Sequence, residues 1–277
     1  MEEGQPSRTA FGAAILRAQH QVLEGGRVFS DPLALRIIGA DASSLGSEAD
    51  PTTSGLRRFI AARSRFAEDS LAAARAIGTR QLVVLGAGLD TYAYRADLTD
   101  LRVLEVDHPS TQAWKRKLLA DASIAVPESL AFVPVDFERD SLAAKLRDSG
   151  FDETQRSFFT WLGVVPYLTR PALMATLGYI ADLPGGAEVV FDYTNSPASV
   201  ADPAHRAALA AVNERVAAVG EVVRSEFETQ SLHADLRALG FRTIEDLGMA
   251  AIATRFFGAP AGAGRDRGAH ILRAATV

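Results

Sequence analysis

The chain has 277 residues, of which 48% are hydrophobic, and its formal net charge is −5 at pH 7. This length suits one large α/β domain or two small ones, and the negative charge argues against a nucleic-acid-binding surface. The absence of cysteine excludes disulfides, thiolate metal sites and a cysteine nucleophile. No stretch approaches the roughly 18 apolar residues of a membrane span, and residues 1–6 carry acids where a signal peptide needs basic residues. We therefore expect a cytoplasmic protein with no membrane partner.

The first part of the chain is predicted to be helical. Apolar residues at helical spacing predict a helix over residues 7–24, which Gly25 and Gly26 end. The pair Asp31-Pro32 opens a short helix over residues 33–38. Residues 41–55 are polar and predict a loop, whereas residues 56–77 predict a long helix.

Strand and helix patterns then alternate, which is typical of a parallel sheet with crossover helices. The predicted strands are 82–85, 103–106, 131–135, 158–162, 188–193, 242–247 and 270–275, with a hairpin as one arrangement of the last two. The predicted helices are 109–122, 141–149, 170–181, 199–219 and 232–239. We predict a single α/β domain over residues 1–277. Its parts are a helical cap (1–78), a cofactor-binding core (79–194), a lid insertion (195–230) and a C-terminal helix with strands (231–277).

A glycine turn follows the first predicted strand. The apolar run 82–85 leads directly into Gly86 and Gly88, which allow a tight turn and a close approach to a ligand. Glu105 comes about 20 residues after Gly86, where nucleotide-binding α/β folds place the carboxylate that holds ribose hydroxyls. Thr91 stands near the place of the third glycine of a dinucleotide fingerprint. A ligand site and a plain strand-to-helix turn both remain open.

Glycines, acids and a tyrosine gather where the predicted strands end, the place at which open α/β sheets bind ligands. These residues are Gly86, Gly88, Glu105, Asp107, Asp136, Asp192 and Tyr193. Carboxylates repel a polyphosphate, and no G-x-x-x-x-G-K-[ST] motif is present. A nucleoside without phosphates fits better, and S-adenosylmethionine is the common one.

Several ordered segments resemble the leucine carboxyl methyltransferase family of class I S-adenosylmethionine-dependent methyltransferases. They are GAGLDTYAYR (86–95), EVDHP (105–109) and WLGVVPYL (161–168), together with residues 62–66 and 240–248. The similarity spans most of the chain and is greatest to the bacterial branch, which includes natural-product O-methyltransferases. The resemblance implies a Rossmann-like, seven-stranded, mostly parallel sheet with helices on both faces, an N-terminal helical extension and a helical lid insertion.

The resemblance also implies S-adenosyl-L-methionine as the cofactor and assigns residues to it. Arg63 would pair with the methionine carboxylate, because a guanidinium fork suits that group. Three residues of the glycine turn, Gly86, Ala87 and Gly88, would pass close to the amino-acid part.

Further carboxylates would hold the rest of the cofactor. Asp107, with Glu105 beside it, would hold the ribose. Asp136 would accept from the adenine amino group, with the Phe137 backbone alongside. One position departs from the family: Leu162 stands where many members carry a glutamate. This departure argues against a close equivalence to the eukaryotic phosphatase-modifying enzymes.

The sequence gives fewer signals for the residues that would bind the methyl acceptor. Tyr167, Tyr193 and His205 are candidate substrate-binding residues, although a core role for the aromatic residues stays open. No histidines are paired at i and i+4, and no G-x-S-x-G elbow is present, so we predict neither a metal site nor a serine hydrolase.

The predicted function is methyl transfer to an oxygen, carboxylate or hydroxyl, of a small molecule, in secondary metabolism. A carboxylate acceptor needs no general base, and we assign none. The alternatives are a protein or peptide carboxyl methyltransferase, a non-catalytic nucleoside-binding module and an NAD-linked oxidoreductase. The sequence leaves the acceptor and the oligomeric state open.

Overall fold

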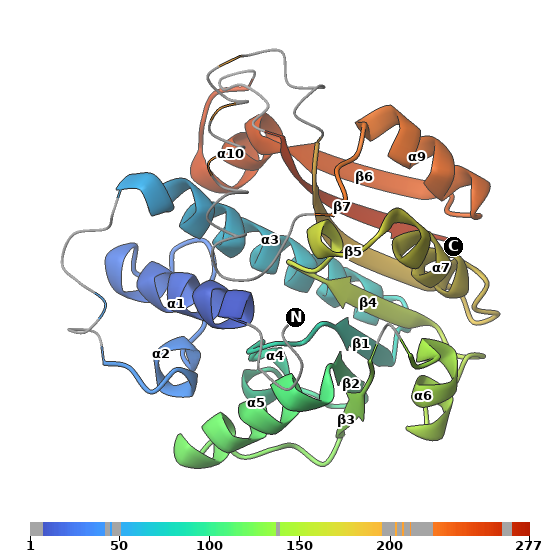
Figure 1. Cartoon of the computed structure of the whole chain (residues 1–277), viewed down its shortest axis with the longest axis horizontal. Helices are drawn as coiled ribbons and strands as arrows, with labels where there is room; N and C mark the ends of the chain where they lie inside the picture. Colours follow the sequence, from blue (N-terminus) through green and yellow to red (C-terminus); the bar gives the residue numbers. More distant parts are fainter. Residues whose placement is uncertain are drawn as a thin grey trace.

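A seven-stranded sheet forms the centre of the computed structural model, which describes residues 8–41, 45, 51–136, 139–195, 203, 207, 211, 224–261 and 268–277. The strands are β1 (Gln81–Leu85), β2 (Arg102–Asp107), β3 (Leu130–Pro134), β4 (Ser157–Trp161), β5 (Ala187–Thr194), β6 (Thr243–Gly248) and β7 (Ala269–Ala275). Their order in space is β3-β2-β1-β4-β5-β7-β6 (Figure 1). The first five strands are parallel, and β7 runs antiparallel to β5 and β6. The predicted mostly parallel α/β sheet is therefore confirmed.

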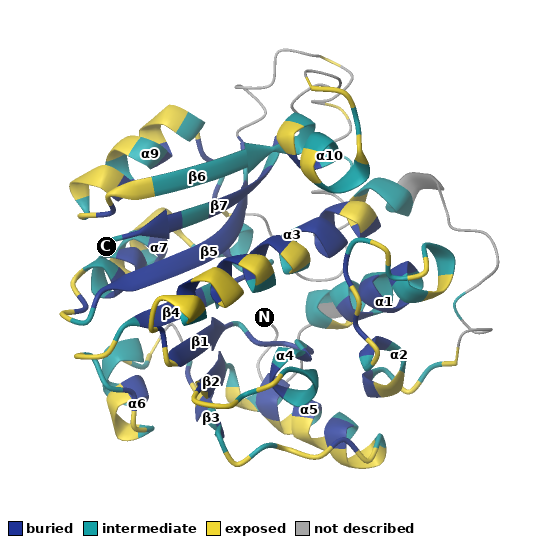
Figure 2. Cartoon of the chain, turned by 180° about the vertical axis from the view of Figure 1, so that it is seen from behind, coloured by how far each residue is buried: buried dark blue, intermediate teal, exposed yellow. Residues whose placement is uncertain are grey.

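Helices cover both faces of this sheet, as its buried strands require. The helices are α1 (Arg8–Leu23), α2 (Ala34–Ile37), α3 (Pro51–Ala76), α4 (Tyr92–Arg95), α5 (Pro109–Asp121), α6 (Leu142–Asp148), α7 (Arg170–Ala181), α9 (Thr229–Ala238) and α10 (Met249–Phe257), with a 3₁₀ turn η2 (Val165–Tyr167). Alternate residues of β1 face opposite ways: Val83 and Leu85 join the core under α6, α7 and α9, whereas Leu82 and Val84 join the core under α3 and α10. Every residue of β1 is buried, as the dark central strands in Figure 2 show.

Helices α3 and α10 differ from the sequence prediction, and the short α4 and η2 were also not predicted. Helix α3 begins at Pro51, so residues 51–55 belong to the helix and not to the predicted loop; proline suits the first helical turn because it needs no N–H donor there. Helix α10 was not predicted, because it is short and begins directly after Gly248, the last residue of β6. It ends at Gly258, whose φ of +67° closes the helix in the left-handed conformation. Because α10 joins β6 to β7, these neighbours are not a tight hairpin.

The predicted helix 199–219, the core of the predicted lid, lies outside the described residues except for positions 203, 207 and 211. Among the residues that the structure describes, no helix combines the length and the apolar character needed to cross a bilayer.

The N-terminal helices lie over the end of the sheet that carries the glycine turn. Helix α1 runs beside α3 (Figure 1), and Arg57 Nη2 of α3 donates to Glu24 Oε1 just after α1, at 2.6 Å. Ala14 of α1 and Ile37 of α2 are fully buried in one apolar cluster with Leu89, which follows the glycine turn. These contacts place the N-terminal segment against the predicted ligand site.

Candidate functional site

The glycine turn after β1 is shaped by close protein contacts. Gly86 and Gly88 have positive φ values of +64° and +45°. A Cβ added to Gly86 would lie 2.4 Å from Val164 Cγ2, and one added to Gly88 would lie 3.0 Å from Ala10 Cβ of α1. Ala87, between them, is buried, and its N–H donates to Val106 O at 3.0 Å. Both glycines are therefore required by packing, whatever ligand the turn also meets.

Asp107 closes the turn from the end of β2. Its Oδ2 accepts the N–H of Gly88 at 2.6 Å, and its Oδ1 accepts the N–H of His108 at 2.7 Å. Burial raises the pKa of the Asp107 carboxyl above its ordinary value, although both N–H donors act in the opposite direction. Each carboxylate oxygen has a second lone pair, so this half-buried group can accept further hydrogen bonds from two hydroxyls.

Glu105, two residues before Asp107 on β2, is paired inside the protein. It is 1% exposed, and its Oε2 pairs with Lys115 Nζ of α5 at 2.7 Å and accepts from the Tyr94 hydroxyl at 3.1 Å. Burial raises the pKa of Glu105, and Lys115 opposes that rise. Glu105 lies two residues before Asp107 on the same face of β2, and so farther from the end of the strand. Glu105 Oε1 is buried without a hydrogen-bond partner among the described residues, so the contact of Glu105 with the ribose stays a prediction.

Arg63 and Asp192 meet on the other side of β1. Arg63 Nη1 of α3 donates to Asp192 Oδ2 of β5 at 2.9 Å. The second carboxylate oxygen, Oδ1, accepts the N–H of Gly163, just after β4, at 2.6 Å. The side chains of Arg63 and Asp192 are 12% and 7% exposed. Arg63, predicted to bind a carboxylate, is thus held at the ends of β4 and β5 by Asp192, one of the acids that the sequence places at the strand ends.

Asp136 stands just beyond β3, at the outer end of the same edge of the sheet. Its N–H donates to Asp140 Oδ2 at 2.9 Å, and its Oδ2 lies 3.7 Å from Nε of the exposed Arg139. Its partner in the predicted adenine site, Phe137, lies outside the described residues. The adenine assignment of both residues stays a prediction.

The structure describes two of the three candidate substrate-binding residues. Tyr193 is 1% exposed, and its hydroxyl donates to Asp246 Oδ2 at 2.7 Å, on the face of the sheet under α9. Its side chain is thus buried inside the protein, and the predicted contact of Tyr193 with a substrate stays a prediction. Tyr167, in η2, is half-buried near the ends of β4 and β5, so its role stays a prediction. His205 lies outside the described residues.

Sequence reasoning missed a buried network that ties the N-terminal segment to the glycine turn. Asp31 Oδ2 accepts from Arg17 Nε of α1 at 3.3 Å and from Thr91 Oγ1 at 2.8 Å. Arg17 Nη2 also donates to Leu89 O at 2.5 Å. The Asp31 side chain is fully buried. The sequence offers no signal for this role, because Asp31 before Pro32 is an ordinary helix start.

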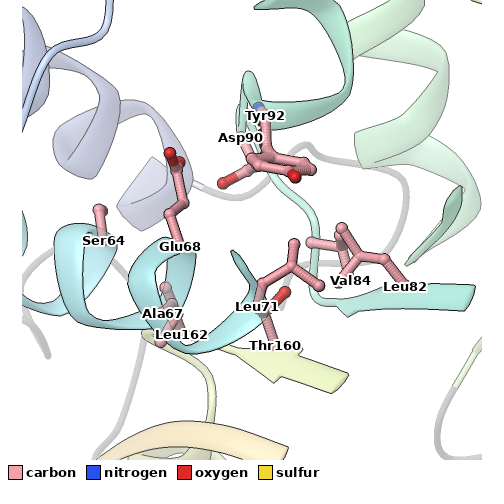
Figure 3. Close-up of a pocket in the computed structure, with 10 residues that line it drawn as sticks. All are labelled: Ser64, Ala67, Glu68, Leu71, Leu82, Val84, Asp90, Tyr92, Thr160 and Leu162. Atoms are coloured by element: carbon pink, nitrogen blue, oxygen red, sulfur yellow. Dashed lines mark hydrogen bonds between the residues drawn. The ribbon is translucent and has the colours of Figure 1, made fainter. Parts of the chain in front are cut away.

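A small cavity adjoins the site between α3 and the strands β1 and β4 (Figure 3). It is lined by Ser64, Ala67, Glu68, Leu71, Leu82, Val84, Asp90, Tyr92, Thr160 and Leu162. Burial raises the pKa of Glu68, which is paired with Arg95. The cavity at Leu162, the position that departs from the family, therefore already holds the carboxyl groups of Glu68 and Asp90. Among the described residues, no three histidine, aspartate or glutamate side chains are grouped to hold a metal ion.

The chain matches the sequence model of a known protein family. Residues 10–181, more than half of the chain, match the sequence model of the leucine carboxyl methyltransferase family. The match covers α1 through α7, and so includes Arg63, the glycine turn and Asp107.

Relatives from bacteria extend the similarity. YktD of Bacillus subtilis, provisionally named an S-adenosyl-L-methionine-dependent methyltransferase, is 35% identical over 199 residues, or 71% of this chain and 65% of that protein. A Saccharopolyspora erythraea protein with the same provisional description is 34% identical over 63% of this chain and 62% of its own length. A Mycobacteroides abscessus relative is 30% identical over 84% of this chain and 75% of its own length. The chain thus spans slightly less than two thirds of the first two relatives.

Solved structures share the fold. A provisional methyltransferase from Thermobifida fusca superposes with a TM-score of 0.60 at 15% identity, covering 99% of this chain and 96% of its own. A DUF574 family protein from Streptomyces avermitilis gives 0.58 at 16% identity, covering 95% and 96%. The sheet order and helices of this chain are those of the class I methyltransferase fold.

Proposed function

This chain belongs to the leucine carboxyl methyltransferase family, and we propose that it is an S-adenosylmethionine-dependent methyltransferase. The acceptor in this proposal is an oxygen, carboxylate or hydroxyl, of a small molecule of secondary metabolism. The proposal draws on family membership, on the provisional names of the relatives and on the residues at the ends of β1, β2, β4 and β5.

One observation carries the proposal: the carboxylate of Asp107 is held against the glycine turn by Gly88 N–H at 2.6 Å. The contact lies beside the boundary between β1 and β4, where the strand order reverses and open α/β sheets bind their ligands. In this position Asp107 would accept the two ribose hydroxyls of the cofactor.

The other end of the site also fits this cofactor. Arg63 Nε is buried and has no hydrogen-bond partner among the described residues. An orphaned guanidinium donor suits the carboxylate of the methionine part. When bound, S-adenosylmethionine supplies an electrophilic methyl group on a sulfonium. The task of the protein is then to orient the acceptor oxygen and to exclude water.

The histidine next to Asp107 favours an acceptor that needs no general base. His108 is the N-cap of α5, and its Nδ1 lies 2.8 Å from Ser110 Oγ and accepts the Ser110 N–H at 3.3 Å. Because His108 caps a helix, it is poorly placed to take a proton from a hydroxyl acceptor. A carboxylic acid is already ionised at neutral pH, so we rank it above a phenol or an alcohol.

Calorimetric titration tests the proposal. The purified chain should bind S-adenosylmethionine and S-adenosylhomocysteine with a Kd on the order of micromolar, and should not bind NAD. Turnover would then be followed against panels of small carboxylic acids, phenols and peptides with a free carboxyl terminus. Binding of NAD alone would contradict the assignment. Methylation confined to the peptides would replace the small-molecule acceptor by a polypeptide.

A further inference from the structure

Two carboxylates at this edge of the sheet are held by the same backbone contact. Asp107 of β2 accepts the N–H of Gly88, which follows the neighbouring strand β1, at 2.6 Å. Asp192 of β5 accepts the N–H of Gly163, which follows the neighbouring strand β4, also at 2.6 Å. Both glycines have positive φ, +45° and +72°. The two pairs flank the β1–β4 boundary, so each limits one side of the predicted cofactor site.

The second oxygen distinguishes the two carboxylates. Asp192 Oδ2 accepts from the Arg63 guanidinium at 2.9 Å, whereas the second oxygen of Asp107 accepts the N–H of His108. Asp107 therefore keeps capacity for a ligand, and Asp192 is engaged with a cation. An arginine side chain in water samples many rotamers, and binding must restrict them at a cost in conformational entropy. Asp192 removes much of that freedom before any ligand arrives.

The surroundings of Arg63 hold its guanidinium in a single place. A Cβ on Gly163 would lie 2.8 Å from Arg63 Nη2, so the guanidinium lies directly against the glycine backbone. Nη1 donates to Asp192 and Nη2 lies against Gly163, whereas Nε is buried and without a partner among the described residues. An immobilised guanidinium with an orphaned donor is prepared for one more acceptor.

We propose that Asp192 is a positioning residue for the cofactor: it holds Arg63 and the Gly163 turn in the geometry in which the guanidinium binds the carboxylate of the cofactor's amino-acid part. This inference rests on the proposed function. The simpler explanation is that the pair only fastens α3 to β5. The two explanations differ in which ligand is affected when the charge of Asp192 is removed.

The test compares two nucleosides that differ only at the amino-acid end. S-adenosylhomocysteine carries that end, and 5′-methylthioadenosine has the same adenosine without it. Calorimetric titration of the full chain should show that Asp192→Asn weakens S-adenosylhomocysteine binding about tenfold or more and changes 5′-methylthioadenosine binding less than about twofold. Asp107→Asn is the matched control, because both nucleosides carry the ribose and both should weaken.

Unchanged binding of 5′-methylthioadenosine to Asp192→Asn shows that the variant is folded at the adenosine side. Equal weakening of both nucleosides, or of neither, would overturn the inference. If Asp192→Asn does not fold, the same substitution is made in Arg63→Ala, where the buried guanidinium is already absent. We expect no further loss of S-adenosylhomocysteine affinity there, because Asp192 acts through Arg63. An added loss would show that Asp192 acts by another route.

The parent chain separates this inference from the proposed function. A parent that binds neither nucleoside overturns both. A parent that binds the two equally well overturns the inference alone, because the amino-acid end then gains nothing from Arg63 and Asp192.

Discussion

On each side of the β1–β4 boundary an aspartate carboxylate accepts a glycine N–H, but the neighbours of the two carboxylates differ. On the β2 side, a carboxylate held by a glycine N–H stands above a buried ion pair, Glu105 with Lys115. On the β5 side, a carboxylate held by a glycine N–H is joined to Arg63, which comes from a helix on the face of the sheet.

This difference shows that the backbone contact sets the place of each carboxylate, and that the neighbouring side chains set its role. The β2 side has neutralised its buried charge internally, so Asp107 has no cation to hold and remains an acceptor for hydroxyl donors. The β5 side brings in a cation, so it suits an anionic group. A nucleoside that is attached to an amino acid needs both kinds of end.

The strongest test of the β2 side removes the cation beneath it. Lys115→Met leaves Glu105 buried without a countercharge, and we expect the free energy of unfolding to fall by about 3–5 kcal/mol in urea titrations at neutral pH. The loss should shrink at acid pH, where Glu105 can protonate. The double variant Glu105→Gln/Lys115→Met should recover most of the stability. A single variant as stable as the parent would mean that the pair does not support this side.

The glycine turn between the two sides is the next most sensitive place. Gly86→Ala should destabilise the chain by about 2–4 kcal/mol, because the left-handed conformation and the clash with Val164 add together. Thermal and urea unfolding measure the loss. Adding Val164→Ala should relieve the clash and leave the conformational part. Gly88→Ala is the milder neighbour, since its nearest contact is 3.0 Å instead of 2.4 Å.

Beyond Asp192, the β5 side is supported by a second buried carboxylate, Asp246. Burial would raise the pKa of Asp246, but the hydrogen bonds from His270, Tyr193 and His233 outweigh it, so this pKa lies below its ordinary value. Its stabilisation is therefore present above the ordinary value of 3.8 and is lost as pH falls through the lowered pKa. Asp246→Asn should cost about 1–3 kcal/mol at neutral pH.

Measuring the free energy of unfolding of this variant at acid pH tests the lowered pKa of Asp246. The parent should lose more stability than Asp246→Asn as the pH falls below about 4. Asp69→Asn, in an exposed pair with Arg65, is the control and should change stability by less than about 1 kcal/mol. A parent and an Asp246 variant with the same acid profile would contradict the lowered pKa.

The smallest effect concerns pH and ligand binding. Because the pKa of Asp107 is raised, its carboxyl protonates at a higher pH than an ordinary aspartate. The ionised form is the better acceptor for hydroxyls, so the affinity for 5′-methylthioadenosine should fall as pH is lowered through that pKa, by at most about tenfold per pH unit. Calorimetry across pH measures this slope. Asp107→Asn should bind weakly with no slope, and an unchanged slope in that variant would assign the titration to another group.

Local sequence was sufficient for much of this molecule. All seven strands were predicted to within about two residues at each end, because short apolar runs ended by glycine or acids are typical of buried parallel strands. Gly86 and Asp107 were found for the same reason: each directly ends such a run. The missed helix α10 follows β6 without a loop, because Gly248 is both the last residue of the strand and the N-cap of the helix.

Two adjacent residues at the end of β5 show what a local sequence pattern does not determine. The sequence placed both Asp192 and Tyr193 at the ligand-binding edge, but only Tyr193 was predicted to contact a substrate. Side chains alternate between the faces of a strand, so these two point in opposite directions. Asp192 faces Arg63 of α3, and Tyr193 faces Asp246 and α9. Only the register of β5 in the sheet decides which of the two faces α3 and which faces α9.

By itself, the sequence determined the fold class, the glycine turn and the acids that end the strands, because each depends on residues that are close together in the chain. The tertiary structure alone decided which of these acids are paired with a cation inside the protein. Glu105 is neutralised by a helix that packs over it, and Asp192 meets Arg63 across 129 positions of sequence. Such pairings depend on how helices settle on the sheet, and no local pattern records them.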